Sequence, residues 1–337
     1  MSNFLVPLHC DCIVMKGLFI GRTIFYEKRP QFHFGTMQRW DRFIFVLSIN
    51  SKKMKKIVIA GSTGYLGSHI VQHLQRRQLD FQAIARSPRK LDALGLASSQ
   101  IIEAQVTDAS SLAGCLAGAD VLISTVGITR QKDGLTYMDV DYQANKNLLD
   151  EAIKSGVKKF VYVSVLHGED LTHLQICAAK ERFVQALRSS GLAYCIIRPS
   201  GFFSDMKEFY EMAKRGRVYL FGDGTTRANP IHGADLAKVC VDAVFQEEEV
   251  IEVGGKETLT HQQIAEIAFD AVGKETKITY IPDWVRRLLL RIAAVFMGKA
   301  SYGTTEFFLN VMALDMATNK YGYRTLKEFF MRLEEDV

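Results

Sequence analysis

The strongest candidates for proton transfer or ligand binding between residues 164 and 180 are Ser164, His173 and Lys180. On an α-helix, residues 173, 176 and 180 share one face, because steps of three and seven residues turn through about 300° and 700°. We therefore expect His173 on the same side as Lys180, with Ile176 between them. Histidine titrates near neutral pH and can donate a proton, whereas isoleucine cannot. For each polar residue, the alternative is an ordinary structural or solvated side chain.

A glycine-rich turn joins a strand pattern to a helix pattern in KKIVIAGSTGYLGSHIVQHLQRR, residues 55–77. Residues 57–59 form a continuous apolar run, as in a strand buried on both faces, and apolar residues then recur at helical spacing. In this context Gly61 permits the tight turn, Gly64 lets the backbone approach a pyrophosphate, and Gly67 lets the helix close on the strand. The positive end of the helix faces the phosphates. We predict a dinucleotide-binding loop; a purely structural turn is the alternative.

The residues after the second predicted strand indicate which dinucleotide binds. An NAD-binding site usually places Asp or Glu near the end of that strand, where it accepts from the ribose 2′-hydroxyl. In FQAIARSPRK, residues 81–90, Arg86 takes that place. A guanidinium binds a 2′-phosphate through two parallel hydrogen bonds, whereas a carboxylate repels it. We therefore predict NADP(H) as the cofactor, with a solvated basic loop as the alternative.

Strand and helix patterns alternate through much of the chain, which predicts a Rossmann-type, doubly wound α/β fold with a parallel sheet. We divide it into an NADP-binding domain, residues 54–200, and a smaller C-terminal substrate lobe, residues 201–337, interleaved with the last Rossmann elements. Ligands of such sheets bind outside the carboxyl ends of the strands. Those ends carry Asp108, Thr125–Gly127, Ser164–His167 and Pro199–Phe203.

Residues 1–53 differ from the rest of the chain. They hold eight Lys/Arg, three Asp/Glu and nine aromatic residues without convincing periodicity, whereas residues 54–337 hold 34 residues of each charge sign. We predict that this leader is not part of the fold because translation starts at Met54; a cleaved organellar presequence is the alternative. The neutral body argues against nucleic-acid binding.

The cysteines bear on compartment and metal binding. Cys10 and Cys12 lie in the leader, and the other four lie in apolar stretches, at positions 115, 177, 195 and 240. We expect those four to be small buried side chains rather than disulfides, and we predict no metal site. A reducing, cytoplasmic compartment fits this pattern, or a plastid or other organelle if residues 1–53 are a presequence.

Two apolar segments of the C-terminal lobe are candidates for substrate or partner contact. Residues 202–212 are rich in Phe, Tyr and Met, and they either line a hydrophobic substrate pocket or form helix core. Residues 284–297 combine arginines with apolar side chains. This stretch is too short to span a bilayer, but it suits contact with a membrane surface or a cover over the substrate; packing against the body is the alternative. Arg227 and His232 are candidates to face an acidic substrate group.

Several motifs resemble an atypical short-chain dehydrogenase/reductase of the NmrA-like branch: GSTGYLGSHIV, VTDASSL, VDYQANKNLLDEAIKSGVKKFVYVSV and AAKERFVQALRSSGLAYCIIRPSGFF. The similarity runs from Lys55 to the C-terminus. Two further stretches are most similar to the divinyl chlorophyllide 8-vinyl reductases: RPSGFFSDMKEFYEMAKRGRVYLFGDGTTRANPIHGADLA and ALDMATNKYGYRTLKEFFMRL. The resemblance implies an NAD(P)-binding Rossmann fold.

The resemblance also implies roles for individual residues. Arg86 would bind the 2′-phosphate and Asp108 the adenine. Thr125 and Gly127 would pass beside the nicotinamide ribose, to which Lys180 would donate a hydrogen bond. Ser164 stands at the usual place of the catalytic serine. The pyrophosphate would be lined by Gly61, Thr63, Gly64, Tyr65, Leu66 and Gly67.

One departure from the family's pattern concerns the reaction. The usual Tyr-x-x-x-Lys pair has lost its tyrosine, because Ile176 stands four residues before Lys180. Carbonyl reduction needs that phenol to protonate a developing alkoxide. Reduction of a conjugated C=C bond delocalises the charge, and the proton can come from water or from a group such as His173. We therefore predict an NADPH-dependent reductase of a hydrophobic, conjugated C=C substrate, such as a tetrapyrrole vinyl group. A non-catalytic NAD(P)H-binding sensor or assembly factor is the alternative.

Overall fold

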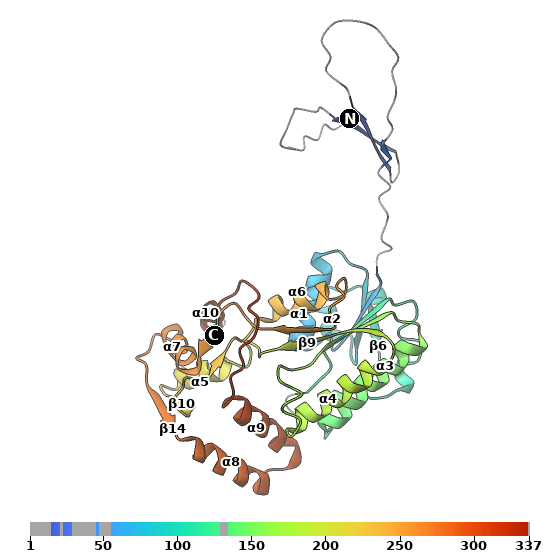
Figure 1. Cartoon of the computed structure of the whole chain (residues 1–337). Coiled ribbons are helices and arrows are strands. Elements are labelled where there is room, and N and C mark those ends of the chain that lie inside the picture. Colours follow the sequence, from blue (N-terminus) through green and yellow to red (C-terminus); the bar gives the residue numbers. More distant parts are fainter. Residues whose placement is uncertain (1–14, 21–22, 29–44, 47–54, 129–133, 336–337) are drawn as a thin grey trace, which may run out of the picture. The chain divides into compact units, whose positions relative to one another are not determined.

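The computed structural model describes residues 15–20, 23–28, 45–46, 55–128 and 134–335 (Figure 1). The chain divides into two compact units, Met1–Met54 and Lys55–Val337. In the first unit, strands β1 (Met15–Ile20), β2 (Thr23–Lys28) and β3 (Phe45–Val46) form an antiparallel sheet, although the sequence there shows no convincing periodicity. The interpretation of residues 1–53 as a leader stays a prediction, and Cys10 and Cys12 lie outside the described residues.

A seven-stranded parallel sheet forms the centre of the second unit. Its spatial order is β12-β9-β8-β7-β4-β5-β6, so the strand order reverses between β4 and β7. This is the predicted doubly wound Rossmann fold, in which ligands bind at such a reversal, outside the carboxyl ends of the strands. The strands are β4 (Ile57–Ala60), β5 (Phe81–Ala85), β6 (Ile101–Glu103), β7 (Val121–Ser124), β8 (Lys159–Val163), β9 (Ala193–Pro199) and β12 (Val250–Val253).

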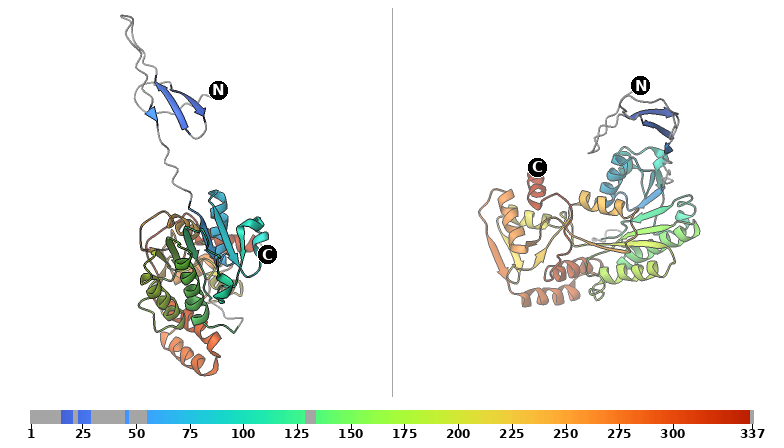
Figure 2. Two further views of the ribbon diagram at one scale, coloured as in Figure 1. Left: turned by 90° about the vertical axis from the view of Figure 1, so that its right-hand side faces the viewer. Right: turned by 45° about the horizontal axis from the view of Figure 1, so that its top comes forward.

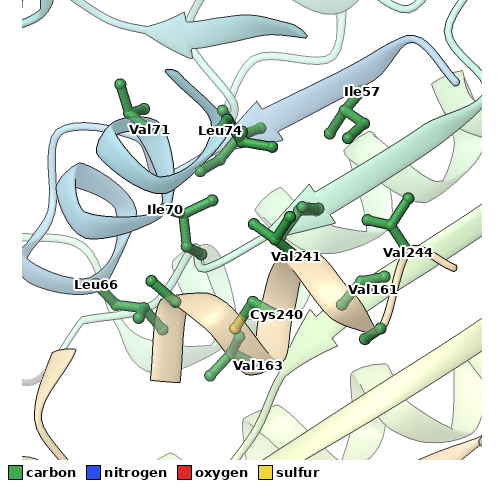
Figure 3. Packing of buried hydrophobic residues seen from close by; sticks show 14 of the residues in the cluster. Ile57, Leu66, Ile70, Val71, Leu74, Val161, Val163, Cys240, Val241 and Val244 are labelled. Atoms are coloured by element: carbon green, nitrogen blue, oxygen red, sulfur yellow. The ribbon is translucent and has the colours of Figure 1, made fainter. Parts of the chain in front are cut away.

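Helices cover both faces of this sheet, which explains why its central strands are apolar without alternation. Every residue of β4, β7 and β8 is buried. On one face, α1 (Tyr65–Arg76) and α6 (Gly233–Asp242) pack through a cluster that includes Ile70, Leu74 and Val241 (Figure 3). The other face is covered by α3 (Asn145–Lys154) and α4 (Gln175–Arg188). A short helix, α2 (Arg89–Asp92), follows β5.

The ribbon of the smaller lobe is seen in Figure 2. A separate cluster of buried side chains forms its core. Phe203, Phe209 and Tyr210 are buried in it, so the segment 202–212 supplies helix core at these positions rather than a pocket lining. The lobe contains α5 (Lys207–Lys214), α7 (His261–Ala271) and α10 (Leu326–Glu335), with the parallel pair β10 (Val218–Phe221) and β14 (Ile278–Ile281) and the antiparallel pair β11 (Arg227–Ala228) and β13 (Leu259–Thr260).

Two further helices follow β14. Helix α8 (Asp283–Phe296) packs beside α9 (Lys299–Val311), which contacts α4. Ala293 is the one buried residue of α8, so the alternative that residues 284–297 pack against the body holds for one side of this helix only. Across the described ranges, no helix is both long and apolar enough to cross a membrane.

The cysteines of the second unit have the predicted environment. Cys177, Cys195 and Cys240 are buried, and Cys115 is half-buried. All four are free thiols, and burial raises the pKa of each, to about 11 for Cys195. They are therefore packing groups rather than nucleophiles. Within the part of the chain that the structure describes, no three His, Cys, Asp or Glu residues are grouped to hold a metal ion.

Candidate functional site

The turn between β4 and α1 requires glycine at two positions. Gly61 has a φ of +82°, in the left-handed region, and a Cβ there would lie 2.5 Å from Thr125 Oγ1. At Gly67, a Cβ would collide with the carbonyl of Gly61, so α1 packs directly on the turn. Thr125 holds the turn from β7: its hydroxyl donates to Gly61 O at 3.2 Å and its amide to Ala60 O at 3.0 Å.

The open side of this turn fits a phosphate group. Gly64 caps α1 without a side-chain hydrogen bond, and no acidic residue lies in the first helical turn. Thr63 and Gly64 are exposed, so the N–H groups that begin the helix face an accessible surface. The side chains of Tyr65 and Leu66 point elsewhere, because the Tyr65 hydroxyl accepts from Gly233 N at 3.2 Å and Leu66 is buried in the core. These two residues therefore offer a phosphate only their main chain.

Arg86 and Asp108 follow β5 and β6, the two strands beyond β4 in the sheet. Both side chains are exposed. Asp108 Oδ1 accepts from the amide and hydroxyl of Ser110, at 2.9 and 2.7 Å, and the hydroxyl bond lowers the pKa of Asp108. The carboxylate is thus held in its charged form at the carboxyl edge of the sheet. Contacts of these two residues with the 2′-phosphate and the adenine stay predictions.

A buried ion pair at the same edge joins Asp141 to Lys180. Their Oδ1 and Nζ atoms lie 2.9 Å apart, and the side chains are 0% and 14% exposed. Asp141 Oδ2 also accepts from Ile128 N at 3.2 Å. A Cβ on Gly127 would lie 2.7 Å from Asp141 Oδ1 and 3.0 Å from Lys180 Nζ. Glycine therefore lets the end of β7 approach the pair, and two predicted cofactor residues, Gly127 and Lys180, lie together.

Burial and pairing act in opposite directions on these charges. Burial disfavours the charge on Lys180, but the Asp141 carboxylate outweighs it and raises the pKa of the lysine. Burial raises the pKa of Asp141, and Lys180 opposes that rise. The Tyr162 ring lies 5.8 Å from Lys180 Nζ, and complete burial raises the pKa of its phenol. A lysine fixed in its protonated form suits hydrogen bonding to a ribose hydroxyl rather than proton exchange.

Asp141 is positioned by an irregular helical turn. Residues Met138–Ala144 form a π-helix that leads into α3. Asn145 braces it, because its buried side-chain amide donates to Asp141 O at 2.9 Å and to Val126 O at 3.1 Å. Its Oδ1 accepts from Ser124 Oγ at 2.6 Å. The network ties the π-helix to the end of β7, and π-helical turns occur frequently at functional sites.

Sequence reasoning did not identify Asp141 or Asn145. The available signal was two polar residues four positions apart, on a helical face that also carries Val140, Ala144 and Leu148. Both side chains are completely buried. A charged residue on an apolar helical face indicates a buried partner of opposite charge, and Lys180 is that partner.

Ser164 belongs to a different buried network. Its hydroxyl donates to Glu181 Oε1 at 3.2 Å. Glu181 forms a two-fold ion pair with Arg198, at 2.7 and 2.9 Å, and Arg198 reaches Glu169 at 2.9 Å. The side chains of Glu181 and Arg198 are both 4% exposed. Ser164 therefore supports a structural ion pair, and its role in orienting a substrate oxygen stays a prediction.

The helix that carries Lys180 begins later than expected. Helix α4 starts at Gln175, because Leu174 has extended backbone with φ of −89° and ψ of 133°. His173 is exposed and precedes the helix. The helical-spacing argument that placed His173 beside Lys180 was therefore wrong, and its role as a proton donor stays without geometric support. Ile176, inside the helix, is 4% exposed in an apolar cluster.

A different phenol belongs to the buried cluster that contains Ile176, where isoleucine replaces tyrosine. Tyr137 belongs to the same buried cluster as Ile176, and its hydroxyl lies 3.1 Å from Thr304 Oγ1 of α9. Burial raises the pKa of Tyr137, so this phenol stays neutral and keeps its proton at neutral pH. No sequence spacing connects positions 137 and 176, and sequence reasoning therefore did not place Tyr137 in this cluster.

The two candidates for an acidic substrate group have structural partners. Arg227 pairs with Asp315 at 2.9 Å. His232 caps α6, where its Nδ1 accepts from Ala234 N at 3.0 Å. Burial lowers the pKa of His232 to about 4, with Arg324 acting in the same direction. A histidine that is neutral at pH 7 offers no cation to an acidic group.

Comparison with known proteins agrees with this geometry. A family model described as NAD(P)H-binding matches residues 61–247, more than half of the chain. The chloroplastic divinyl chlorophyllide a 8-vinyl-reductase of Arabidopsis thaliana is 29% identical over 326 residues, which cover 84% of this chain and 78% of the relative. The similarity to divinyl reductases that the motifs predicted is confirmed.

Two other similarities concern a protein with a different named role and the fold. The photosystem II assembly factor Ycf39 of Trieres chinensis is 22% identical over 277 residues, which cover 81% of this chain and 86% of the relative. A solved structure of an NADPH-dependent quinone oxidoreductase from Escherichia coli, in complex with NADPH, matches with a TM-score of 0.66 and 19% identity, over 82% of this chain and 99% of that one. At this identity the structure supports the fold.

Proposed function

The chain belongs to the NAD(P)H-binding family, and from that premise we propose that it is an NADPH-dependent reductase of a hydrophobic, conjugated C=C substrate. The observation that carries the proposal is a combination of two residues on α4. Lys180 is fixed in its protonated form, and the residue four positions earlier is the buried Ile176. The ammonium group that would position a nicotinamide ribose is present, whereas the phenol that carbonyl reduction needs is absent from its usual place. Reduction of a conjugated C=C bond tolerates that loss, because the developing charge delocalises.

The chain's own residues would bind and orient the cofactor. When bound, NADPH supplies a hydride. The amides that begin α1 would donate to its pyrophosphate, and Arg86 would donate to its 2′-phosphate. Lys180 would donate to a ribose hydroxyl while Asp141 compensates its charge. The proton that completes the reduction would come from water or from Tyr137, the phenol in the same buried cluster as Ile176.

The substrate proposal is supported by the relatives. Those named divinyl chlorophyllide a 8-vinyl-reductase, from plants, match more than three quarters of this chain. We therefore propose a vinyl group on a tetrapyrrole as the substrate. These relatives are chloroplastic, which favours the plastid alternative for residues 1–53 over the cytoplasmic location predicted from the cysteines.

Oxidation of NADPH by the purified full chain tests this function. We expect loss of NADPH absorbance to depend on divinyl chlorophyllide, with the monovinyl compound as the product found by mass spectrometry. A simple ketone is the matched control and should give no oxidation. Binding of NADPH without oxidation by divinyl chlorophyllide or by any conjugated enone would contradict the proposal.

A second candidate function is a non-catalytic NAD(P)H-binding assembly factor. The similarity to Ycf39 favours it, and so does the loss of the phenol at position 176. Such a protein would bind NADP⁺ and NADPH, would show no substrate-dependent oxidation, and would co-purify with a protein partner. The oxidation assay and the co-purification therefore separate the two functions.

A further inference from the structure

Helix α8 leaves its apolar side chains in contact with solvent. Figure 1 shows it beside α9, on the side away from α4, and of its residues only Ala293 is buried. Trp284, Val295 and Phe296 are 63%, 75% and 82% exposed. Leu288, Leu289 and Ile292 are exposed as well. A contiguous exposed surface of this kind marks a binding face rather than ordinary variation of the protein surface.

These six residues form one stripe along the helix. At about 100° per residue, they fall within an arc of about 140°. The opposite side attaches α8 to α9, because Arg286 donates to Leu309 O at 3.3 Å and to Asn310 Oδ1 at 3.2 Å. The helix is thus held by the side that carries Arg286, Leu290 and Ala293, and the six exposed apolar residues lie on the other side.

The charges of α8 favour an anionic surface. The helix contains Arg286, Arg287 and Arg291 against Asp283, a surplus of two positive charges, whereas residues 54–337 as a whole hold equal numbers of Lys/Arg and Asp/Glu. Arg287 and Arg291 lie four residues apart, just outside one edge of the apolar stripe, and both are exposed. From that edge their long side chains can reach the phosphates of lipids into which the stripe is inserted.

We propose that α8 lies in the surface of an anionic lipid bilayer, with its apolar stripe inserted between the headgroups. The stripe extends from Trp284 to Phe296 along α8 and has its cations at one border, which suits a planar interface better than a small ligand. Only α9 separates α8 from Tyr137, which packs with Ile176, so the bilayer would lie one helix away from the site. The proposal does not depend on the reaction proposed above.

The tryptophans give a local measurement. The chain has two, Trp40 and Trp284, so the Trp40→Phe full chain reports on α8 alone. We expect this protein to float with vesicles of phosphatidylcholine and phosphatidylglycerol, and its emission to shift to shorter wavelength. Both effects should weaken with added salt and should be much smaller with phosphatidylcholine alone. The emission distinguishes α8 from the basic residues 1–53, because a contact made only by those residues leaves Trp284 in water.

Paired variants complete the test. Leu288→Gln with Val295→Gln changes two exposed side chains, and it should reduce vesicle binding at least tenfold without changing the melting temperature. Met331→Gln, at an exposed apolar residue of α10, is the matched control and should bind like the parent. Unshifted Trp284 emission, undiminished binding by the double variant, or equal binding to neutral vesicles would each overturn the proposal. Self-association that the double variant abolishes would overturn it in favour of a second copy on this face.

Discussion

Lys180 shows how one residue can serve both the fold and the site. Its ammonium compensates a carboxylate that is completely buried, and it also lies against Gly127, where the nicotinamide ribose is expected. A loss of activity on substituting Lys180 alone therefore has two possible origins. The structural origin is the buried charge of Asp141, and the functional origin is the missing hydrogen-bond donor.

Substituting both partners of the pair separates these origins. Lys180→Met leaves Asp141 buried and unpaired, and we expect it to destabilise the protein by about 3–5 kcal/mol. Lys180→Met combined with Asp141→Asn removes both charges and should recover most of that stability. The double variant should still bind NADPH more weakly than the parent, as measured by fluorescence titration. Equal melting temperatures for Lys180→Met and the double variant would contradict the structural role of the pair.

Asp205 predicts a pH dependence of stability. Burial raises its pKa to about 6, while the Phe202 amide, which donates to its Oδ2 at 3.1 Å, opposes that rise. Because the folded-state pKa lies above the unfolded value, the stability that protonated Asp205 contributes is fully present below about pH 4. It is lost as the pH rises through about 6. Asp205→Asn keeps an acceptor for the Phe202 amide and does not titrate. Relative to the parent, we expect it to gain roughly 1–3 kcal/mol of unfolding free energy between pH 4 and pH 8.

Asp223→Asn is the matched control for this pH dependence. The Thr225 hydroxyl donates to Asp223 at 2.6 Å and lowers its pKa. The stability that Asp223 contributes is present above the unfolded pKa and lost as the pH falls. Urea unfolding at several pH values should therefore show the two variants diverging from the parent in opposite directions. The same direction for both would mean that the pKa of Asp205 is not raised in the folded protein.

At the scale of elements, the regular parts of the fold follow from sequence patterns. The apolar run at β4 predicted a strand buried on both faces, and the glycine spacing predicted that α1 packs on the turn after β4. These predictions succeed because the residues that decide them are neighbours in the chain. The start of α4 was misplaced, because Leu174 adopts an extended backbone that no residue in the segment specifies.

The elements that complete the site depend on distant residues. The π-helix Met138–Ala144 persists because Asn145 bonds to the end of β7, and Asp141 is stable in it because Lys180 lies on α4. Neither condition is visible from positions 138–145 alone. Likewise, α8 is amphipathic in sequence, but only the structure shows that its apolar stripe has no cover among the described residues.

The two glycines around the start of α1 give a prediction at this scale. A Cβ at Gly67 meets backbone atoms of Gly61 and Ser62, whereas a Cβ at Gly64 meets only Gly61 O, at 3.3 Å. We expect Gly67→Ala to push α1 off the turn, with a loss of about 1–3 kcal/mol in unfolding free energy and of NADPH binding. Gly64→Ala should fold nearly normally and still weaken NADPH binding, because its methyl group covers the phosphate side. Thermal unfolding and NADPH titration of both variants check this; normal binding by Gly64→Ala would place the pyrophosphate elsewhere.

At the scale of the whole molecule, the positions that carry the site are spread over much of the sequence. These positions follow or flank five different strands, and the parallel sheet gathers them at one edge. They are the glycine turn, Arg86, Asp108, Gly127, Asp141 and Lys180. A ligand that contacts several of these positions at once stabilises the second unit as a whole, since the contacts exist only when the sheet is folded.

This coupling between binding and stability allows the predicted preference for NADPH over NADH to be measured. NADPH at about 100 times its dissociation constant should add about 2.7 kcal/mol to the unfolding free energy, which raises the melting temperature by several degrees. NADH at the same concentration should give a smaller rise, because it lacks the 2′-phosphate that Arg86 would bind. Arg86→Ala should make the two shifts nearly equal, whereas Arg215→Ala, at an exposed arginine of the other lobe, should leave the difference intact. Equal shifts with the parent protein would show that Arg86 does not select the coenzyme.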